Sequence, residues 1–267
     1  MKEFDPFFEA NKQLWNRRTA VHKDSDFYDL AGFKAGKNSL TPVELEELGD
    51  VRGKSLLHLQ CHFGIDTLSL ARMGARCTGI DLSNDAIKLA KELNDELKLD
   101  ATFICCNVYD TSKYVLEMFD IVFTSYGVIG WLPGLAPWAK VVAERLKPGG
   151  FFYMAEFHPV VWMFDDDFTH IKYAYENKEV IVTENEGTYT DRNAVIKGKE
   201  YSWNHSLSEV LNALLGEGLK IEFFNEYMYS PYPCFRNSVE TEPGKWQIAG
   251  MEGKIPMLFS LKAIKPG

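Results

Sequence analysis

The sequence predicts an α/β fold in which helices cover both faces of a mostly parallel sheet. Between residues 54 and 157, short apolar runs of strand length alternate strictly with longer runs of helical periodicity, and turn residues separate them. Strands that alternate with helices in this way connect by right-handed crossovers and form a parallel sheet. The chain has 267 residues, which suffices for one elaborated domain of this kind.

Each expected strand in this region is short and apolar, and the helices between them have start and stop signals. Gly74 is expected to end the first helix and Ser83 to cap the second. In chain order, we expect strands at SLLHL, RCTGID, ATFICC, FDIVFTS and GGFFYMAEF, and helices at IDTLSLARM, NDAIKLAKELNDEL and LAPWAKVVAERL.

Three further segments complete this single domain. Residues 1–50 have helix-forming composition and are expected to form a helical cap, whose last short helix begins at Ser39 or Thr41. Residues 158–205 break the alternation with runs such as EVIVTENEGTYT, which predicts a strand-rich insertion. Residues 206–265 restore it with a helix, a strand at KIEFFNEYMY, a loop, and a last strand at PMLFSLKAIK; an antiparallel edge is expected here.

Composition narrows the class of partner. The net charge of −9 disfavours sequence-independent binding to nucleic-acid phosphates and favours a small-molecule partner. The five cysteines form no CxxC pair, and no histidine and carboxylate spacing resembles a metal site, so no bound metal is expected.

The N-terminal sequence carries acids where a signal peptide would be basic, and no apolar run has membrane-spanning length. A cytoplasmic protein is therefore expected.

The turn after the first expected strand, QCHFG, lies where a doubly wound sheet binds its ligand. Asp81 ends the second strand 21 residues after Gln60, close to the spacing of an acid that accepts hydrogen bonds from ribose hydroxyls. The alternative is that Asp81 only favours the start of the helix after it.

The composition of this turn restricts the type of nucleotide. A dinucleotide-binding turn needs several glycines, because backbone amides must approach the pyrophosphate closely. Here only Gly64 is present, and His62 and Phe63 would crowd a diphosphate. A nucleoside without phosphates makes fewer demands on the turn, so this ligand class is favoured.

These segments together resemble a known family. LLHLQCHFGIDTLSLA is similar to the first motif of class I S-adenosylmethionine-dependent methyltransferases, and GIDLS, ICCNVYD, FDIVFTSYGVIGWL and ERLKPGGFFYMAEFHP resemble the later motifs in order. The resemblance covers about residues 54–159 and the closing helix and strands. It implies a Rossmann-like sheet of seven strands in the order 3-2-1-4-5-7-6, with strand 7 antiparallel.

The resemblance also implies a binding site for S-adenosyl-L-methionine. Asp81 would hold the ribose hydroxyls, Leu82 would lie against the adenine, and Asn107 and the Val108 backbone would meet the adenine amino group. Leu82 can equally be core, and Asn107 can equally be a turn residue. The remaining cofactor residues would be Gln60, Cys61, His62 and Gly64 in the turn, with Ser125 and Tyr126 near the methionine moiety and the methyl group.

The first motif departs from the family pattern at three positions. His58 stands where the family has an acid, and Gln60 and His62 stand where it has glycines. A lost glycine can mean that the backbone has changed or that a side chain occupies cofactor space. Alternatively, Gln60 or His62 could donate or accept a hydrogen bond at the amino-acid end of the cofactor.

Methyl transfer needs the donor and the nucleophile held in line, and a base only if the nucleophile is protonated. His158, in EFHP at the end of the fifth strand, is one candidate base, and Tyr126 is a second candidate for a catalytic role. The alternative for His158 is a structural histidine that fixes the chain before Pro159.

Acceptor specificity should come from the N-terminal helix and the insertion. VVWMFDDDF and YMYSPYPCF supply aromatic residues that could wall an apolar pocket or could be ordinary core. Arg17 and Arg18 could pair with a carboxylate of cofactor or substrate, but a solvated helix face is the expected environment.

The leading hypothesis is a methyltransferase that transfers a methyl group to a small-molecule acceptor by in-line displacement. The depleted glycines leave a non-catalytic S-adenosylmethionine- or nucleoside-binding module as an alternative. Methylation of RNA or protein is a further alternative, and the acidity of the chain weighs against RNA. A nicotinamide oxidoreductase is disfavoured by the turn. Neither the acceptor nor the oligomeric state follows from the sequence.

Overall fold

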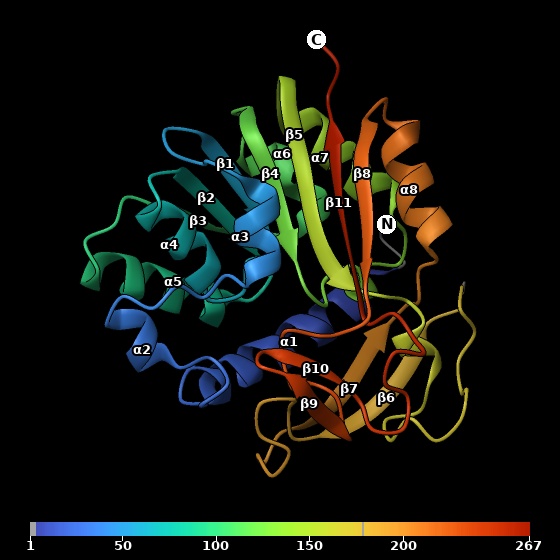
Figure 1. The fold of residues 1–267 in the computed structure, drawn as a ribbon. Coiled ribbons are helices and arrows are strands. Elements are labelled where there is room, and N and C mark those ends of the chain that lie inside the picture. The colour runs from blue at the N-terminus through green and yellow to red at the C-terminus, as the bar shows by residue number, and fades with distance from the viewer. Residues whose placement is uncertain (1–3, 178) are drawn as a thin grey trace.

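The central feature of the fold is a mixed sheet of seven strands in the order β3-β2-β1-β4-β5-β11-β8 (Figure 1). The computed structural model describes residues 4–177 and 179–267. Neighbouring strands are parallel from β3 to β5, and β11 is antiparallel to both β5 and β8. The predicted strand order, with an antiparallel last strand, is therefore confirmed. The strands are β1 (Ser55–Leu59), β2 (Arg76–Asp81), β3 (Thr102–Cys105), β4 (Phe119–Ser125), β5 (Leu146–Phe157), β8 (Lys220–Tyr227) and β11 (Leu258–Ile264).

The helices begin where the sequence carries capping residues. The side chain of Ser83 accepts a hydrogen bond from the Ala86 amide, and that of Ser206 accepts one from the Glu209 amide. Thr41 forms a capping box with Glu44, so the short helix begins after Thr41. The helices are α1 (Asp5–His22), α2 (Leu30–Lys34), α3 (Pro42–Leu48), α4 (Ile65–Arg72), α5 (Asn84–Glu96), α6 (Thr111–Tyr114), α7 (Ala136–Arg145) and α8 (Leu207–Gly216).

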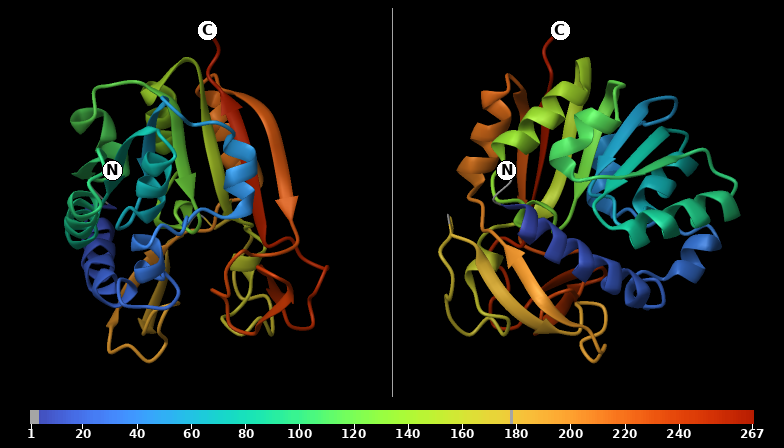
Figure 2. Two further views of the ribbon diagram at one scale, coloured as in Figure 1. Left: turned by 60° about the vertical axis from the view of Figure 1, so that its left-hand side comes forward. Right: turned by 180° about the vertical axis from the view of Figure 1, so that it is seen from behind.

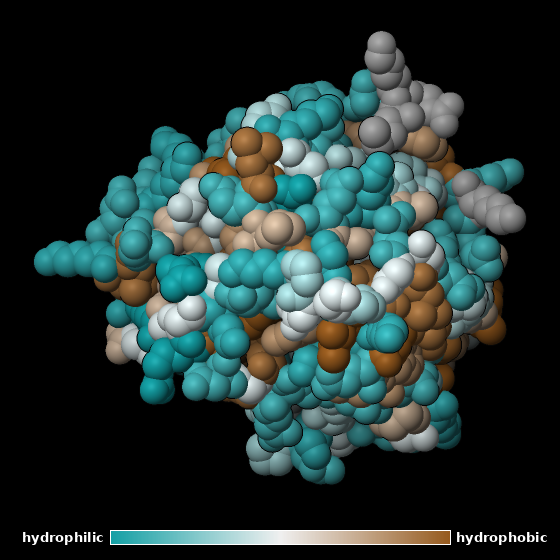
Figure 3. All heavy atoms as spheres, turned by 90° about the horizontal axis from the view of Figure 1, so that it is seen from above, coloured by the Kyte–Doolittle hydropathy of each residue, from teal (hydrophilic) through white to brown (hydrophobic). Residues whose placement is uncertain are grey.

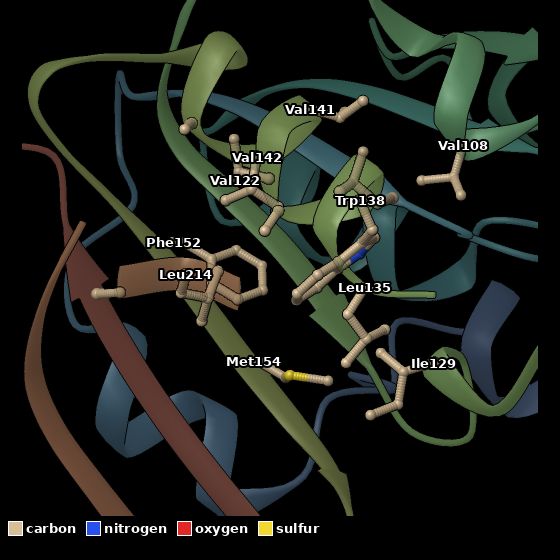
Figure 4. Packing of buried hydrophobic residues seen from close by; sticks show 14 of the residues in the cluster. Val108, Val122, Ile129, Leu135, Trp138, Val141, Val142, Phe152, Met154 and Leu214 are labelled. Atoms are coloured by element: carbon tan, nitrogen blue, oxygen red, sulfur yellow. The ribbon is translucent and has the colours of Figure 1, made fainter. Parts of the chain in front are cut away.

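Alternating strand residues build a core on each face of the sheet. On one face, Val122 and Phe152 pack with Trp138 of α7 and Leu214 of α8, and all four side chains are fully buried (Figure 4). On the other face, Phe123 and its strand neighbours pack against α3 and α4. Burial of this apolar surface on both faces supplies the main stabilisation of the sheet.

A cap covers the carboxyl ends of the parallel strands, and we define it as α1, α2 and two hairpins. Figures 1 and 2 show these elements together below the strands, with α1 running across the end of the sheet. The insertion forms the antiparallel hairpin of β6 (Ile181–Glu186) and β7 (Lys197–Ser202). A second hairpin, β9 (Ser238–Glu242) and β10 (Lys245–Ile248), occupies a segment that was expected to be loop, so that part of the prediction is wrong.

The opposite end of the molecule, seen from above in Figure 3, carries mostly hydrophilic residues with smaller hydrophobic groups between them. Within the part of the chain that the structure describes, no helix has both the length and the apolar character needed to cross a membrane. The candidate site lies at the other end of the sheet, under the cap.

Candidate functional site

A cavity of about 860 Å³ lies between the carboxyl ends of the strands and the cap. Its volume is within the range of small-molecule sites, about 300–1,000 Å³. The turn after β1, the ends of β2 and β4 and the segment after β3 all contribute to its wall. The lining includes every residue expected to contact a cofactor: Gln60, Cys61, His62, Gly64, Asp81, Leu82, Asn107, Val108, Ser125 and Tyr126.

The turn keeps a left-handed backbone although it has lost two glycines. The φ angles of Gln60, His62 and Gly64 are 57°, 51° and 78°. Non-glycine residues adopt this region at a cost of about 1 kcal/mol or more. Of the two explanations for a lost glycine, a changed backbone is therefore excluded, and the question becomes where the two side chains lie.

The side chain of Gln60, which lines the cavity, has one of its two polar atoms paired and the other unpaired. Its Nε2 donates a hydrogen bond to the carbonyl oxygen of Val128 over 2.9 Å. Its Oε1 is buried and has no hydrogen-bond partner among the described residues. A buried amide oxygen without a partner is costly, and a ligand that donates a hydrogen bond to it would remove that cost.

The side chain of His62 packs against the N-terminal segment. Its ring lies 5.3 Å from that of Trp15 and 5.2 Å from that of His22, centroid to centroid. Burial, followed by the nearby charges of His22 and Arg18, lowers the pKa of His62 well below its usual range, so its ring is neutral. His62 therefore helps to attach α1 to the turn, and its side chain forms part of the cavity wall.

Asp81, the predicted ribose-binding acid, is fixed by two backbone amides. Its Oδ2 accepts a hydrogen bond from the His62 amide and its Oδ1 one from the Ser83 amide, each over 2.8 Å. Burial raises its pKa to about 6, against the opposing effect of these amides, so the carboxylate is mostly ionised at neutral pH. Each carboxylate oxygen keeps a second acceptor site for a ligand hydroxyl.

The segment after β3 combines an apolar wall with one amide. Val108 is buried, and Leu82 lies on the same cavity wall. The Oδ1 of Asn107 accepts a hydrogen bond from the Tyr109 amide over 3.0 Å, which is the turn role given as the alternative. Because a carbonyl oxygen has two lone pairs, Asn107 can cap this turn and still accept one hydrogen bond from a ligand.

A buried glutamate shapes the loop after β4. Both carboxylate oxygens of Glu156 accept hydrogen bonds from amides of that loop: Oε1 from Gly127, and Oε2 from Val128 over 2.8 Å. The preceding residue, Tyr126, has a φ of 29°, and its hydroxyl donates a hydrogen bond to Oε2 of Glu44 over 2.9 Å. The loop held by Glu156 and the hydrogen bond to Glu44 together fix the aromatic ring of Tyr126 in the cavity wall.

His158 does not line the cavity. Its side chain is buried, its Nε2 lies 2.9 Å from Oε1 of Glu226, and its Nδ1 accepts a hydrogen bond from the Val160 amide over 3.2 Å. The expectation of a substrate-facing base at this position is therefore corrected. The geometry corresponds to the alternative, a structural histidine that orders the chain around Pro159.

Helix α1 contributes to the cavity wall, as expected of the N-terminal helix, but the sequence reasoning did not identify which of its residues do so. Arg18 was expected on a solvated face, but it is buried, its Nη2 lies 2.6 Å from Oε2 of Glu200 on β7, and it stacks on Trp15 and Trp131. Arg17 is exposed. The spacing of residues in the sequence could have revealed this wall. Four residues of α1 that line the cavity follow one another at intervals of three and four, which places them on one face of the helix. They are Phe8, Asn11, Trp15 and Arg18.

Comparison with known proteins agrees with this geometry. Residues 56–150 match the family described as Methyltransferase domain. A ubiquinone biosynthesis O-methyltransferase of Chromobacterium violaceum is 26% identical over 156 residues, which are 57% of this chain and 61% of that protein. One from Coxiella burnetii is 29% identical over 128 residues, 47% of this chain and 54% of that protein. The chain thus matches little more than half the length of these relatives.

Two solved structures share the fold. An S-adenosylmethionine-dependent methyltransferase from Mesorhizobium loti has a TM-score of 0.57 at 19% identity, covering 86% of this chain and 99% of that one. One from Clostridium acetobutylicum has a TM-score of 0.57 at 14% identity, covering 92% and 95%. Residues 56–150 are thus similar to a methyltransferase domain, and the chain shares the fold and the strand order of S-adenosylmethionine-dependent methyltransferases.

Proposed function

We propose that this protein transfers a methyl group from S-adenosyl-L-methionine to a small-molecule acceptor. The observation that carries the proposal is the position of Asp81, whose carboxylate lies in the cavity beside a left-handed turn at the end of β1. This arrangement suits a phosphate-free nucleoside, because the acid can accept hydrogen bonds from the ribose hydroxyls and a turn with a single glycine is unsuited to a pyrophosphate.

The lining residues fit this cofactor in chemical type. Asp81 supplies acceptors for the ribose, Leu82 and Val108 supply an apolar wall for the adenine, and the unpartnered Oε1 of Gln60 can accept a hydrogen bond from the ammonium of the amino-acid end. The aromatic rings along the wall, including Trp15 and Trp131, favour a cationic sulfonium.

The bound cofactor would supply an electrophilic methyl group, and the protein would hold the cofactor and the acceptor in position. Glu156 holds the loop that carries Tyr126, so the tyrosine ring occupies a fixed place on the wall. We assign Tyr126 the role of orienting the acceptor, because its hydroxyl is held by Glu44 and its ring faces the cavity. Fixed orientation of two reactants is the main requirement of an in-line displacement.

A small acceptor is supported by the size of the cavity, about 860 Å³, and by its walls, which include residues of α1 and of both hairpins. The names of the relatives, ubiquinone biosynthesis O-methyltransferases, favour an oxygen nucleophile on a small molecule. The net charge of −9 disfavours an RNA substrate. All five cysteines are unpaired, which agrees with a reducing compartment, and we propose the cytoplasm.

The test is incubation of the purified protein with methyl-labelled S-adenosyl-L-methionine and fractionated cell extract. We expect label in the small-molecule fraction and none with an Asp81→Ala variant. Label in RNA or protein fractions would overturn the choice of substrate. Cofactor binding without transfer into any fraction would favour a non-catalytic binding module, and no binding at millimolar cofactor would overturn the function.

A further inference from the structure

The hydroxyl of Tyr126, to which the proposed function gives the role of orienting the acceptor, is bonded to a buried glutamate. Its Oη donates a hydrogen bond to Oε2 of Glu44 over 2.9 Å. Tyr126 belongs to the loop after β4 and Glu44 to α3, so the contact joins two elements whose residues are 82 positions apart. Tyr126 lines the cavity, whereas Glu44 is fully buried and does not line it. The hydroxyl therefore connects the cavity wall to a carboxylate behind it.

Capping of α3 accounts for only part of this arrangement. A capping box requires that Glu44 accept a hydrogen bond from the amide of Thr41, and its Oε2 does so over 3.1 Å. It requires neither the burial of the carboxylate nor a bond to a distant element. The second oxygen, Oε1, is buried and has no hydrogen-bond partner among the described residues. Because a buried and incompletely paired carboxylate is costly, its presence favours a role for Glu44 beyond the cap.

The ionised carboxylate fixes the direction of the hydrogen bonds around Tyr126. A carboxylate can only accept, and a tyrosine hydroxyl has a single hydrogen, so that hydrogen is directed at Glu44. The hydroxyl of Thr41, whose Oγ1 lies 3.0 Å from Oη of Tyr126, also donates to Oε2 of Glu44. The Tyr126 oxygen is therefore left to accept a hydrogen bond from a ligand.

We propose that Glu44 is a positioning residue that acts through Tyr126: it orients the Tyr126 hydroxyl and takes up the proton that the acceptor loses. This inference rests on the proposed function. The nucleophile gives its proton to the Tyr126 oxygen, while the hydrogen of Tyr126 passes to Oε2 of Glu44. The new C–O or C–N bond forms as the C–S bond breaks, and the electron pair of the broken bond stays on sulfur.

The same polarity selects the class of acceptor. A hydroxyl or an amine can donate a hydrogen bond to the Tyr126 oxygen, whereas a carboxylate has no hydrogen to donate. The ring of Tyr126 lies beside those of Phe157 and Tyr232, with centroids 5.8 Å and 5.3 Å away, and all three residues line the cavity. Such a wall favours an apolar or aromatic body on the molecule that carries the nucleophile.

The charge state of Glu44 makes the proposal measurable. Burial raises the pKa of Glu44 to about 7, the charge of Asp66 on α4 adds to this rise, and the hydrogen bonds from Thr41 and Tyr126 oppose it. As the pH falls through 7, the ionised form that can take up a proton is lost. Burial first, and in part the charge of Glu44, raise the pKa values of three tyrosines, which therefore stay protonated in this range: Tyr126, Tyr153 and Tyr232.

The experiment measures the initial rate of label transfer from methyl-labelled S-adenosyl-L-methionine into the small-molecule fraction of a cell extract, between about pH 5.5 and 8.5. We expect the wild-type rate to rise with pH, with a midpoint near 7. Glu44→Gln keeps an oxygen for Thr41 and Tyr126 but takes up no proton. We expect it to be about 100-fold slower at the upper end of the range and to lack the midpoint.

Two further variants separate this role from a structural one. Tyr126→Phe should be slowed to a similar extent, and the double variant should be no slower than the slower single variant, because both residues serve one proton transfer. Glu46→Gln is the matched control, since it removes the same charge at an exposed position of α3, and it should keep the wild-type profile. Calorimetry should show unchanged cofactor binding in Glu44→Gln, because Glu44 does not line the cavity.

Three results would overturn the proposal: a wild-type rate that is constant around pH 7, the same pH profile in the wild type and Glu44→Gln, or single losses that multiply in the double variant. The first result needs no variant, so it decides even if Glu44→Gln does not fold. Absence of transfer into any fraction by the wild type would refute the proposed function and this inference with it. Transfer with a flat pH profile would refute this inference alone.

Discussion

The amide of His62 donates a hydrogen bond to the carboxylate of Asp81 over 2.8 Å, so the acid that ends β2 also fixes the turn that ends β1. Replacing Asp81 therefore removes both the expected ribose contact and the support of the turn. We expect Asp81→Ala to weaken S-adenosyl-L-methionine binding by about 100-fold, as the loss of charge-assisted hydrogen bonds predicts. Isothermal titration calorimetry measures this effect. Asp100→Asn, at an exposed position, should bind like the wild type, and similar weakening in both variants would refute the role of Asp81.

Gly64 is required for two separate reasons, and the chain offers a control that separates them. A Cβ at Gly64 would lie 2.5 Å from Cε1 of Phe103 at a φ of 78°, whereas one at Gly53 would meet nothing within 4 Å at a φ of 73°. We expect Gly64→Ala to lower the free energy of unfolding by about 2–4 kcal/mol and Gly53→Ala by about 1 kcal/mol. Urea denaturation gives both values, and equal losses would show that the contact with Phe103 is relieved without cost.

Gln60 combines a strained backbone with a buried amide oxygen that has no hydrogen-bond partner among the described residues. We expect Gln60→Gly to weaken cofactor binding about tenfold, because the variant relieves the strain and removes the acceptor offered to the amino-acid end. Lys98→Gly is the matched control, since Lys98 is exposed and has a φ of 53°. It should increase the free energy of unfolding by up to about 1 kcal/mol and leave binding unchanged. If Gln60→Gly binds the cofactor with wild-type affinity, the Gln60 side chain only fills the turn and does not contact the cofactor.

His58 gives the protein a defined sensitivity to acid. Burial lowers its pKa to about 3, and its Nδ1 shares a hydrogen bond with Oγ1 of Thr67 over 2.8 Å. Between pH 6.5 and about 3, the unfolded chain therefore binds a proton at this residue that the folded chain does not, and stability falls as the pH falls.

The measurement is the free energy of unfolding between pH 7 and 4.5 for the wild type and His58→Gln. We expect the wild type to lose about 1–3 kcal/mol more than the variant across this range. Parallel pH profiles for the two proteins would contradict the prediction.

The sheet could be predicted because its signals are local. Each strand from β1 to β5 is an apolar run with its own turn residues, and Ser83 and Ser206 cap helices that begin where expected. The hairpin of β9 and β10 had no such signal. Four of the five residues of β9 are exposed, so no apolar alternation marks it.

The cofactor half of the site was located by position in a motif series, and its residues do line one cavity. The roles of those residues remain predictions. For the rest of the cavity wall the sequence indicated only segments, such as the N-terminal helix and YMYSPYPCF, because the residues that meet there are distant in sequence. Arg18 was placed on the wrong face for the same reason, since its partner, Glu200, is 182 residues away.

Much of the cavity wall comes from segments that lie outside residues 56–150, the stretch that matches the methyltransferase domain family. Tyr28, Tyr189 and Tyr232 all fall outside residues 56–150, whereas Asp81 and Gln60 fall within them. Substitutions in the outer segments can therefore change the shape and polarity of the cavity while the turn after β1 stays intact.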